Sequence, residues 1–158
     1  MLVGISGHQR LPQDDDWEWV RGELVTCLRA TPALVGVSSL AIGADTLFAR
    51  VVLELGGLLS VVLPFHDYEN RFNSPEERVE YRTLVRQAST IEVLHRSGAD
   101  EEAYYAAGRR VADLSELLIV VWNGKPAGGL GGTADIVKYA RQRGKRMVWL
   151  NPSDRTKA

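Results

Sequence analysis

The sequence predicts an α/β fold in which an open parallel sheet is covered by helices on both faces. Apolar runs alternate along the chain with amphipathic stretches of helical period, the pattern of repeated strand–helix–strand units. One run, residues 117–122, is apolar at every position, which is typical of a parallel strand buried on both faces. Right-handed crossovers leave few other arrangements for 158 residues. We therefore expect one Rossmann-like, three-layer domain over residues 1–150, followed by a polar tail over residues 151–158.

The first half of the chain supplies three strands and two helices. The strands are expected where apolar runs end at glycine or proline, over residues 2–5, 34–41 and 58–63. The first helix begins after the acids at 14–16, and Pro32 ends it. The second begins at Ala44 and ends at Gly56. Apolar side chains recur at helical spacing in both helices.

The second half repeats the alternation after a polar and aromatic loop over residues 66–74. Ser74 and Pro75 open a helix, because serine caps a helix start and proline fits its first turn. Further helices are expected over residues 100–113 and 133–143, and further strands over residues 91–94, 117–122 and 146–150.

Composition excludes several classes of protein. The 19 basic and 20 acidic residues give a net charge of −1, which provides no general attraction to nucleic acid or to an anionic membrane. Cys27 is the single cysteine, so the chain holds no internal disulfide and no zinc site built on cysteine pairs. The histidines lack metal-ligand spacing, no apolar run is long enough to cross a bilayer, and no signal peptide is evident. We expect a cytoplasmic domain without a metal.

Ligands of open α/β sheets bind beyond the carboxyl ends of the strands. The richest loop there is the glycine segment that follows the buried strand, with Gly128, Gly129, Gly131, Gly132 and Thr133. Glycines let a backbone approach a ligand closely, and the helix that follows offers unpaired amides to an anion. We interpret this segment as a ligand loop; the alternative is a flexible surface loop with Thr133 as helix cap.

A second helix start follows the strand over residues 34–41. The amides of Gly43 and Ala44 are candidates for a phosphate. Asp45 would repel an anion there, so it either accepts from a ribose hydroxyl or favours the helix dipole.

The loop after the first strand brings Gly7, His8 and Arg10 to the same edge. Arg10 either binds phosphate or is solvated, and His8 either faces the ligand or fixes its loop by hydrogen bonds. In the helix over residues 100–113, Gly108 indicates close packing or close ligand approach, and Arg109 is a candidate pocket residue.

These segments resemble the SLOG superfamily, which includes the Lonely Guy phosphoribohydrolases and the DNA-processing protein DprA. The likeness lies in the sequence VGISGHQR over residues 3–10, in SSLAIGAD over residues 38–45, and in the module over residues 105–134 that ends in GGTA. The family implies a Rossmann-like fold and a nucleotide or nucleotide-derived ligand, with phosphate at Gly43 and at residues 131–133. It also implies a homodimer; we expect no cofactor.

The resemblance leaves the function open between classes. We favour a binding module or sensor. The alternative is a phosphoribohydrolase of the Lonely Guy kind, with Asp135 and Arg109 as catalytic residues. In the PGGxGTxxE motif of the Lonely Guy enzymes, the glutamate would fall on Ile136, one position after Asp135. One residue turns a helical side chain by about 100°, so Asp135 does not automatically take the role of that glutamate. A DprA-like single-stranded DNA binder is the least favoured class because of the net charge.

Overall fold

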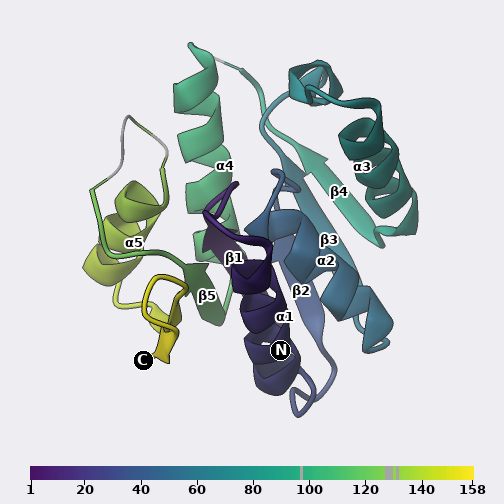
Figure 1. Ribbon diagram of the computed structural model, residues 1–158. Helices are drawn as coiled ribbons and strands as arrows, with labels where there is room; N and C mark the ends of the chain where they lie inside the picture. Colours follow the sequence, from purple (N-terminus) through teal and green to yellow (C-terminus); the bar gives the residue numbers. More distant parts are fainter. Residues whose placement is uncertain (97, 127–129, 131) are drawn as a thin grey trace.

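The expected parallel sheet is confirmed by a computed structural model, which describes residues 1–96, 98–126, 130 and 132–158. Within these residues the sheet has seven strands in the order β4-β3-β2-β1-β5-β6-β7 (Figure 1). All neighbours are parallel except β6 and β7. The strands span Leu2–Gly7 (β1), Val35–Ser38 (β2), Leu58–Leu63 (β3), Thr90–Val93 (β4), Leu117–Val121 (β5), Arg146–Asn151 (β6) and Thr156–Lys157 (β7).

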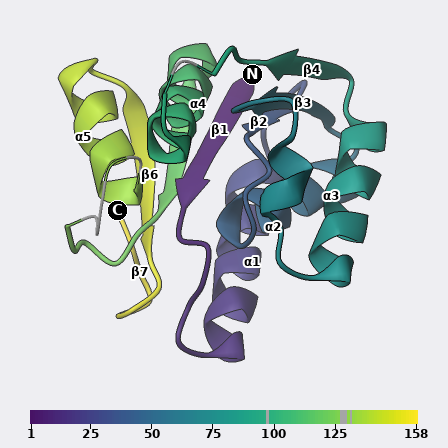
Figure 2. The ribbon, with the colours of Figure 1, turned by 90° about the horizontal axis from the view of Figure 1, so that it is seen from above.

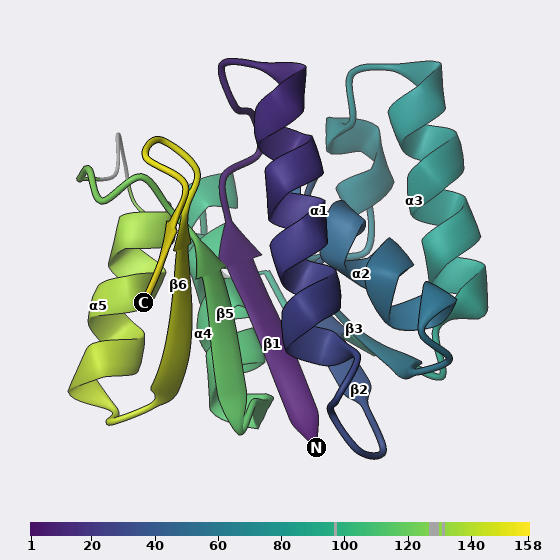
Figure 3. The ribbon, with the colours of Figure 1, turned by 60° about the horizontal axis from the view of Figure 1, so that its bottom comes forward.

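Helices cover both faces of the sheet and complete the three layers. They span Asp14–Leu28 (α1), Ala44–Glu54 (α2), Pro75–Gln87 (α3), Asp100–Leu114 (α4) and Thr133–Gln142 (α5), with a short 3-10 helix at Tyr68–Arg71 (η1). The helices α1, α2 and α3 lie on one face, and α4 and α5 lie on the other (Figures 2 and 3). This division follows from the strand order, since right-handed crossovers to the two sides of β1 put their helices on opposite faces.

The strand β5 has core packing on both sides, as its all-apolar sequence predicts. Ile119 and Val121 belong to the cluster that α1 and α2 close. Leu118 and Val120 belong to the cluster under α4 and α5. Burial of both faces removes this strand from solvent and fixes the position of the loop that leaves its carboxyl end.

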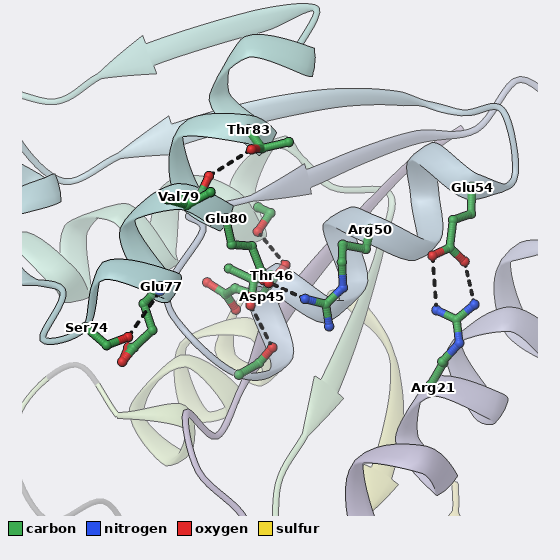
Figure 4. Close-up of polar contacts among 12 residues, drawn as sticks. Arg21, Asp45, Thr46, Arg50, Glu54, Ser74, Glu77, Val79, Glu80 and Thr83 are labelled. Atoms are coloured by element: carbon green, nitrogen blue, oxygen red, sulfur yellow. Dashed lines mark hydrogen bonds and ion pairs between the residues drawn. The ribbon is translucent and has the colours of Figure 1, made fainter.

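Local sequence sets the ends of the helices on the α1–α3 face. The hydroxyl of Ser74 accepts a hydrogen bond from the Glu77 amide at 3.1 Å and caps α3, as expected (Figure 4). Arg50 on α2 pairs with Glu80 on α3 at 2.6 Å across the surface. Such exposed pairs contribute little energy, so the buried apolar clusters hold the layers together.

Two segments differ from the expectation. The strand β2 ends at Ser38 rather than at residue 41, because Leu40 takes a left-handed conformation with φ of 58°. Its amide donates to the Ser38 hydroxyl at 3.1 Å instead of extending the sheet. The polar segment 151–158 turns back to form β7, and the backbones of Trp149 and Ala158 exchange hydrogen bonds at 2.8 and 2.9 Å.

The strand order places a ligand crevice at a defined point. The chain leaves β1 toward β2 on one side, and it returns on the other side of β1 with β5. The connections therefore diverge above the carboxyl ends of β1 and β5, and this divergence opens a crevice in doubly wound sheets.

Candidate functional site

A cavity of about 460 Å³ opens at the carboxyl ends of β1 and β5. Six parts of the chain line it: the end of β1, the segment from β2 into α2, the segment after β3 with η1, α4, the loop after β5, and the start of α5. Of the residues that the sequence singled out, it brings together Gly7, His8, Asp45, Gly108, Gly132 and Thr133. The volume lies in the range of small-molecule sites.

Gly7 lets three elements meet at the floor of the cavity. A Cβ atom at this position would lie 2.6 Å from the Ala44 Cβ and 2.8 Å from the Val121 Cβ. No side chain fits there without displacing β1 from α2 or from β5. The role of this glycine is therefore close packing beneath the cavity.

His8 fixes the loop after β1 through three hydrogen bonds. Its amide donates to the Val121 carbonyl at 3.1 Å, and its carbonyl accepts from the Ala44 amide at 3.1 Å. Its ring Nε2 accepts from the Asn123 amide at 3.0 Å, which requires that nitrogen to be unprotonated. Burial also lowers the pKa of the imidazole. His8 is thus a neutral residue that links β1, β5 and α2; because it also lines the cavity, contact with a ligand stays a prediction.

The start of α2 uses its backbone differently from the expectation. Gly43 has φ of 86°, and a Cβ on it would lie 2.4 Å from the Gln9 carbonyl oxygen. The close approach that this glycine permits is therefore to the loop after β1. The Ala44 amide, expected at a phosphate, donates to His8 instead. Gly43 lines a separate groove between α2 and α3.

Asp45, in the first turn of α2, is a buried acid in the wall of the cavity, with 7% of its surface exposed. Its Oδ2 accepts from the Ala41 amide at 3.3 Å. Burial raises the pKa of the carboxyl to about 7, and the Ala41 hydrogen bond only partly opposes that rise. Asp45 therefore changes its protonation near neutral pH.

The start of α5 faces the cavity with its first turn. Gly132, Thr133 and Ala134 line the wall, and Thr133 is buried. The amides of Asp135 and Ile136 return to the Gly132 carbonyl at 3.1 and 3.3 Å. No acceptor among the described residues pairs with the amides of Thr133 and Ala134, as expected for a first helical turn. The candidates Gly128, Gly129 and Gly131 lie outside the described residues.

Arg10 does not line this cavity. Its side chain is 70% exposed, and its nearest acid is Glu77 at 4.0 Å. Arg10 instead borders grooves next to α1, α2 and η1. The solvated alternative for this arginine fits its surroundings.

The two candidate catalytic residues also lie off the cavity wall. Asp135 comes between Ala134 and Ile136, which both line the cavity, and its own side chain does not. Arg109 stacks on the Tyr105 ring at 4.6 Å, and its buried Nε has no hydrogen-bond partner among the described residues. Gly108 beside it serves close packing, since a Cβ there would lie 2.5 Å from the Ile136 Cδ1. A catalytic role for Asp135 and Arg109 stays a prediction.

Several lining residues were not among the sequence candidates. Lys125 is the one Lys or Arg among the described residues that line the cavity. It lies in the loop after the buried strand, four residues beyond Val121, where ligands of such sheets bind, so its position could have identified it. Ser39, Tyr68 and Tyr104 also line the cavity. Tyr68 lies in η1 within the loop 66–74, and only the tertiary fold packs it against Leu40 and the residues of β3.

Neither a metal centre nor a membrane span is found in the described part of the chain. Its His, Cys, Asp and Glu side chains form no group of three that could hold an ion. None of its helices has the length and apolar character needed to cross a bilayer.

Comparison with known proteins finds relatives by structure alone. No protein-family model matches the chain, and no curated protein matches its sequence. Solved structures share its fold at low identity. DprA from Streptococcus pneumoniae has 20% identity and a TM-score of 0.64, with 93% of this chain and 49% of that chain covered. DprA from Helicobacter pylori, described with its single-stranded DNA binding mode, has 18% identity and a TM-score of 0.67, with 94% of this chain and 64% of that chain covered.

A different kind of protein shares the same architecture. The molybdenum cofactor binding protein from the phototrophic bacterium Rippkaea orientalis has 16% identity and a TM-score of 0.57, with 95% of this chain and 76% of that chain covered. The chain spans about half to two-thirds of the two DprA structures. The comparisons thus show the fold: a Rossmann-like domain that this chain shares with the two DprA structures and with the molybdenum cofactor binding protein.

Proposed function

We propose that the chain is a binding module for a nucleotide or nucleotide-derived ligand, held in the cavity between β1, β5, α4 and α5. The observation that carries the proposal is the start of α5: Gly132, Thr133 and Ala134 line the cavity at the crevice of the sheet, and the amides of Thr133 and Ala134 have no acceptor among the described residues. The positive end of the helix dipole favours an anion there. Lys125 adds a cation at the same wall.

The fold of the relatives supports a small-molecule site. The Rippkaea orientalis protein is named for binding the molybdenum cofactor. The cavity of this chain has the size for one such ligand rather than for a polymer. Of the two helix starts that the sequence suggested, α5 offers its amides to a phosphate, whereas α2 contributes the Asp45 side chain.

A charge placed in the first turn of α5 tests the anion site. Ala134→Glu keeps the helix, because an acid in the first turn is favourable, but it repels a phosphate. We expect calorimetry to show AMP binding weakened about tenfold or more in this variant and adenosine binding unchanged. Gln142→Glu adds the same charge at the other end of α5 and is the matched control. Equal AMP affinity in both variants would contradict the proposal.

Single-stranded DNA is a second candidate, favoured by a groove beside the cavity. The net charge of −1 disfavours nucleic acid, yet the Helicobacter pylori DprA, which shares this fold, is described with single-stranded DNA. Arg10, Lys125 and Arg155 line this groove of about 850 Å³, although Asp16 and Asp154 lie in it too. DNA binding would weaken steeply with salt and would be lost in Arg10→Ala and in Arg155→Ala. The affinity for a ligand in the cavity would not change in either variant.

A further inference from the structure

The inference drawn here rests on the proposed function and concerns the wall of the cavity opposite the start of α5. That wall carries hydroxyl, carboxyl and phenol groups: Ser39, Asp45, Tyr68 and Tyr104. No Lys or Arg among the described lining residues comes from it. The two walls therefore suit different parts of one ligand, an anion at α5 and a group that donates hydrogen bonds opposite it.

Ser39 is a buried polar group without a partner. Its hydroxyl oxygen is enclosed and has no hydrogen bond among the described residues. An enclosed hydroxyl left unpaired is destabilising, and such groups in folded proteins usually have a partner. Ser39 lines the cavity, so rotation of its χ1 angle would bring the hydroxyl to a bound ligand that can supply that partner.

Asp45 has acceptor capacity beyond its single described contact. A carboxylate offers about four lone-pair sites, and the Ala41 amide occupies one of them at a long 3.3 Å. Asp45 can therefore accept further hydrogen bonds from a ligand. The other titratable groups on the cavity wall are His8, Tyr68, Tyr104 and Lys125. His8 is neutral and burial raises the pKa of both phenols, so Asp45 is the group of this wall that ionises near neutral pH.

The loop that carries both residues is held in place before any ligand arrives. The Ser38 hydroxyl donates to the Asp45 carbonyl at 3.1 Å and accepts from the Leu40 amide. The Thr46 hydroxyl donates to the Gly43 carbonyl at 3.2 Å (Figure 4). A loop fixed in this way binds a ligand with little ordering cost.

We infer that Ser39 and Asp45 form a subsite that accepts hydrogen bonds from an uncharged part of the ligand. When Asp45 is ionised, the same subsite excludes a second anionic group. The ligand class is then a nucleoside monophosphate with its phosphate at α5. A nucleotide with an additional phosphate on its ribose would bring a like charge toward Asp45, in a setting with little water to screen it.

The test compares AMP with adenosine 3′,5′-bisphosphate in the wild type and in Asp45→Asn, a substitution of nearly equal size. At about pH 8 the wild type should prefer AMP by about tenfold, and Asp45→Asn should lose most of that preference. At about pH 6 the wild-type preference should shrink, because Asp45 is then largely protonated. Comparing the two proteins at each pH cancels the titration of the ligand's own phosphate.

Two further variants separate the subsite from the proposed anion site. Ser39→Ala should weaken both AMP and adenosine severalfold without changing the preference between AMP and the bisphosphate. Asp113 is an acid on α4 that accepts a hydrogen bond from Tyr139. Asp113→Asn should therefore keep the wild-type affinities for AMP and the bisphosphate. Unchanged discrimination in Asp45→Asn would overturn the inference even where AMP binds. AMP binding that is insensitive to Ala134→Glu but sensitive to Asp45→Asn would overturn the anion site alone.

Discussion

At the scale of single residues, the chemistry of the loops is used first to join elements and only then to shape the cavity. His8, Gly43 and Ala44 looked like ligand groups because they follow strands at the carboxyl edge. In the structure their hydrogen bonds and close approaches are to one another and to Gln9, Val121 and Asn123. A sequence cannot separate these roles, because a glycine or an amide beside a ligand and one beside another loop have the same local pattern.

The role of Gly43 can be measured against another glycine with positive φ. Gly43 and Gly56 have φ of 86° and 79°, but only Gly43 has backbone atoms in the place of a Cβ, whereas Gly56 has open space. Gly56→Ala should cost about 1 kcal/mol for the left-handed backbone alone. Gly43→Ala should cost about 3 kcal/mol or more, because the loop after β1 must also move. Equal losses in urea unfolding would contradict the contact between these loops.

Asp45 should make stability fall as pH rises. The pKa of its carboxyl is raised in the folded state, to about 7, so the folded protein binds more protons than the unfolded chain between about pH 4 and pH 7. The free energy of unfolding therefore decreases across that window and is level above it. Between pH 5 and pH 8 this group should cost about 3 kcal/mol, at about 1.4 kcal/mol per unit of pH up to its folded pKa.

Asp45→Asn isolates this contribution from those of the other acids. The variant should gain stability relative to the wild type by about 3 kcal/mol more at pH 8 than at pH 5. Urea titrations of both proteins at the two pH values give the difference directly. A constant difference between the two proteins would show that Asp45 keeps an ordinary pKa.

At the scale of elements, the alternation of strands and helices was predictable because burial imposes it. β3 has the expected bounds, and β5 is buried on both faces as its apolar run requires. The predictions are wrong where a few residues decide the end of a strand or form a very short strand. β2 ends early at the turn formed by Ser38 and Leu40, and β7 is too short to leave an apolar pattern.

The packing of α4 against α5 depends on a glycine and can be tested with a second helical glycine. Gly22 in α1 has nothing within 4 Å of its missing Cβ, whereas Gly108 in α4 has the Ile136 Cδ1 at 2.5 Å. Gly22→Ala should stabilise the protein by up to about 1 kcal/mol through helix propensity. Gly108→Ala should gain less or lose stability, because the end of the Ile136 side chain must move.

Ile136→Val removes the contacting Cδ1 atom and completes the comparison. In that background Gly108→Ala should be more favourable by about 1 kcal/mol, which a double-mutant cycle measures. A cycle without coupling would contradict the close contact of α4 with α5 at the cavity wall.

At the scale of the whole molecule, the strand order decides where a ligand can bind, and the loops decide which ligand binds there. The sequence sufficed to predict the sheet, its two helical layers and the edge that carries the site. It did not identify Ser39 or Tyr68, which reach the cavity through a turn and a 3-10 helix without a pattern of their own. The homodimer implied by the family resemblance stays a prediction.

The most direct test of the nucleotide site is a titration of the ¹⁵N-labelled protein with AMP, followed amide by amide. We expect the amide resonances of Gly132, Thr133 and Ala134 to shift together. Their shifts and that of the Asn123 amide, which also lines the cavity, should give the same dissociation constant for AMP. Shifts confined to the groove between α2 and α3, around Arg50 and Glu80, with the start of α5 unchanged, would contradict the account.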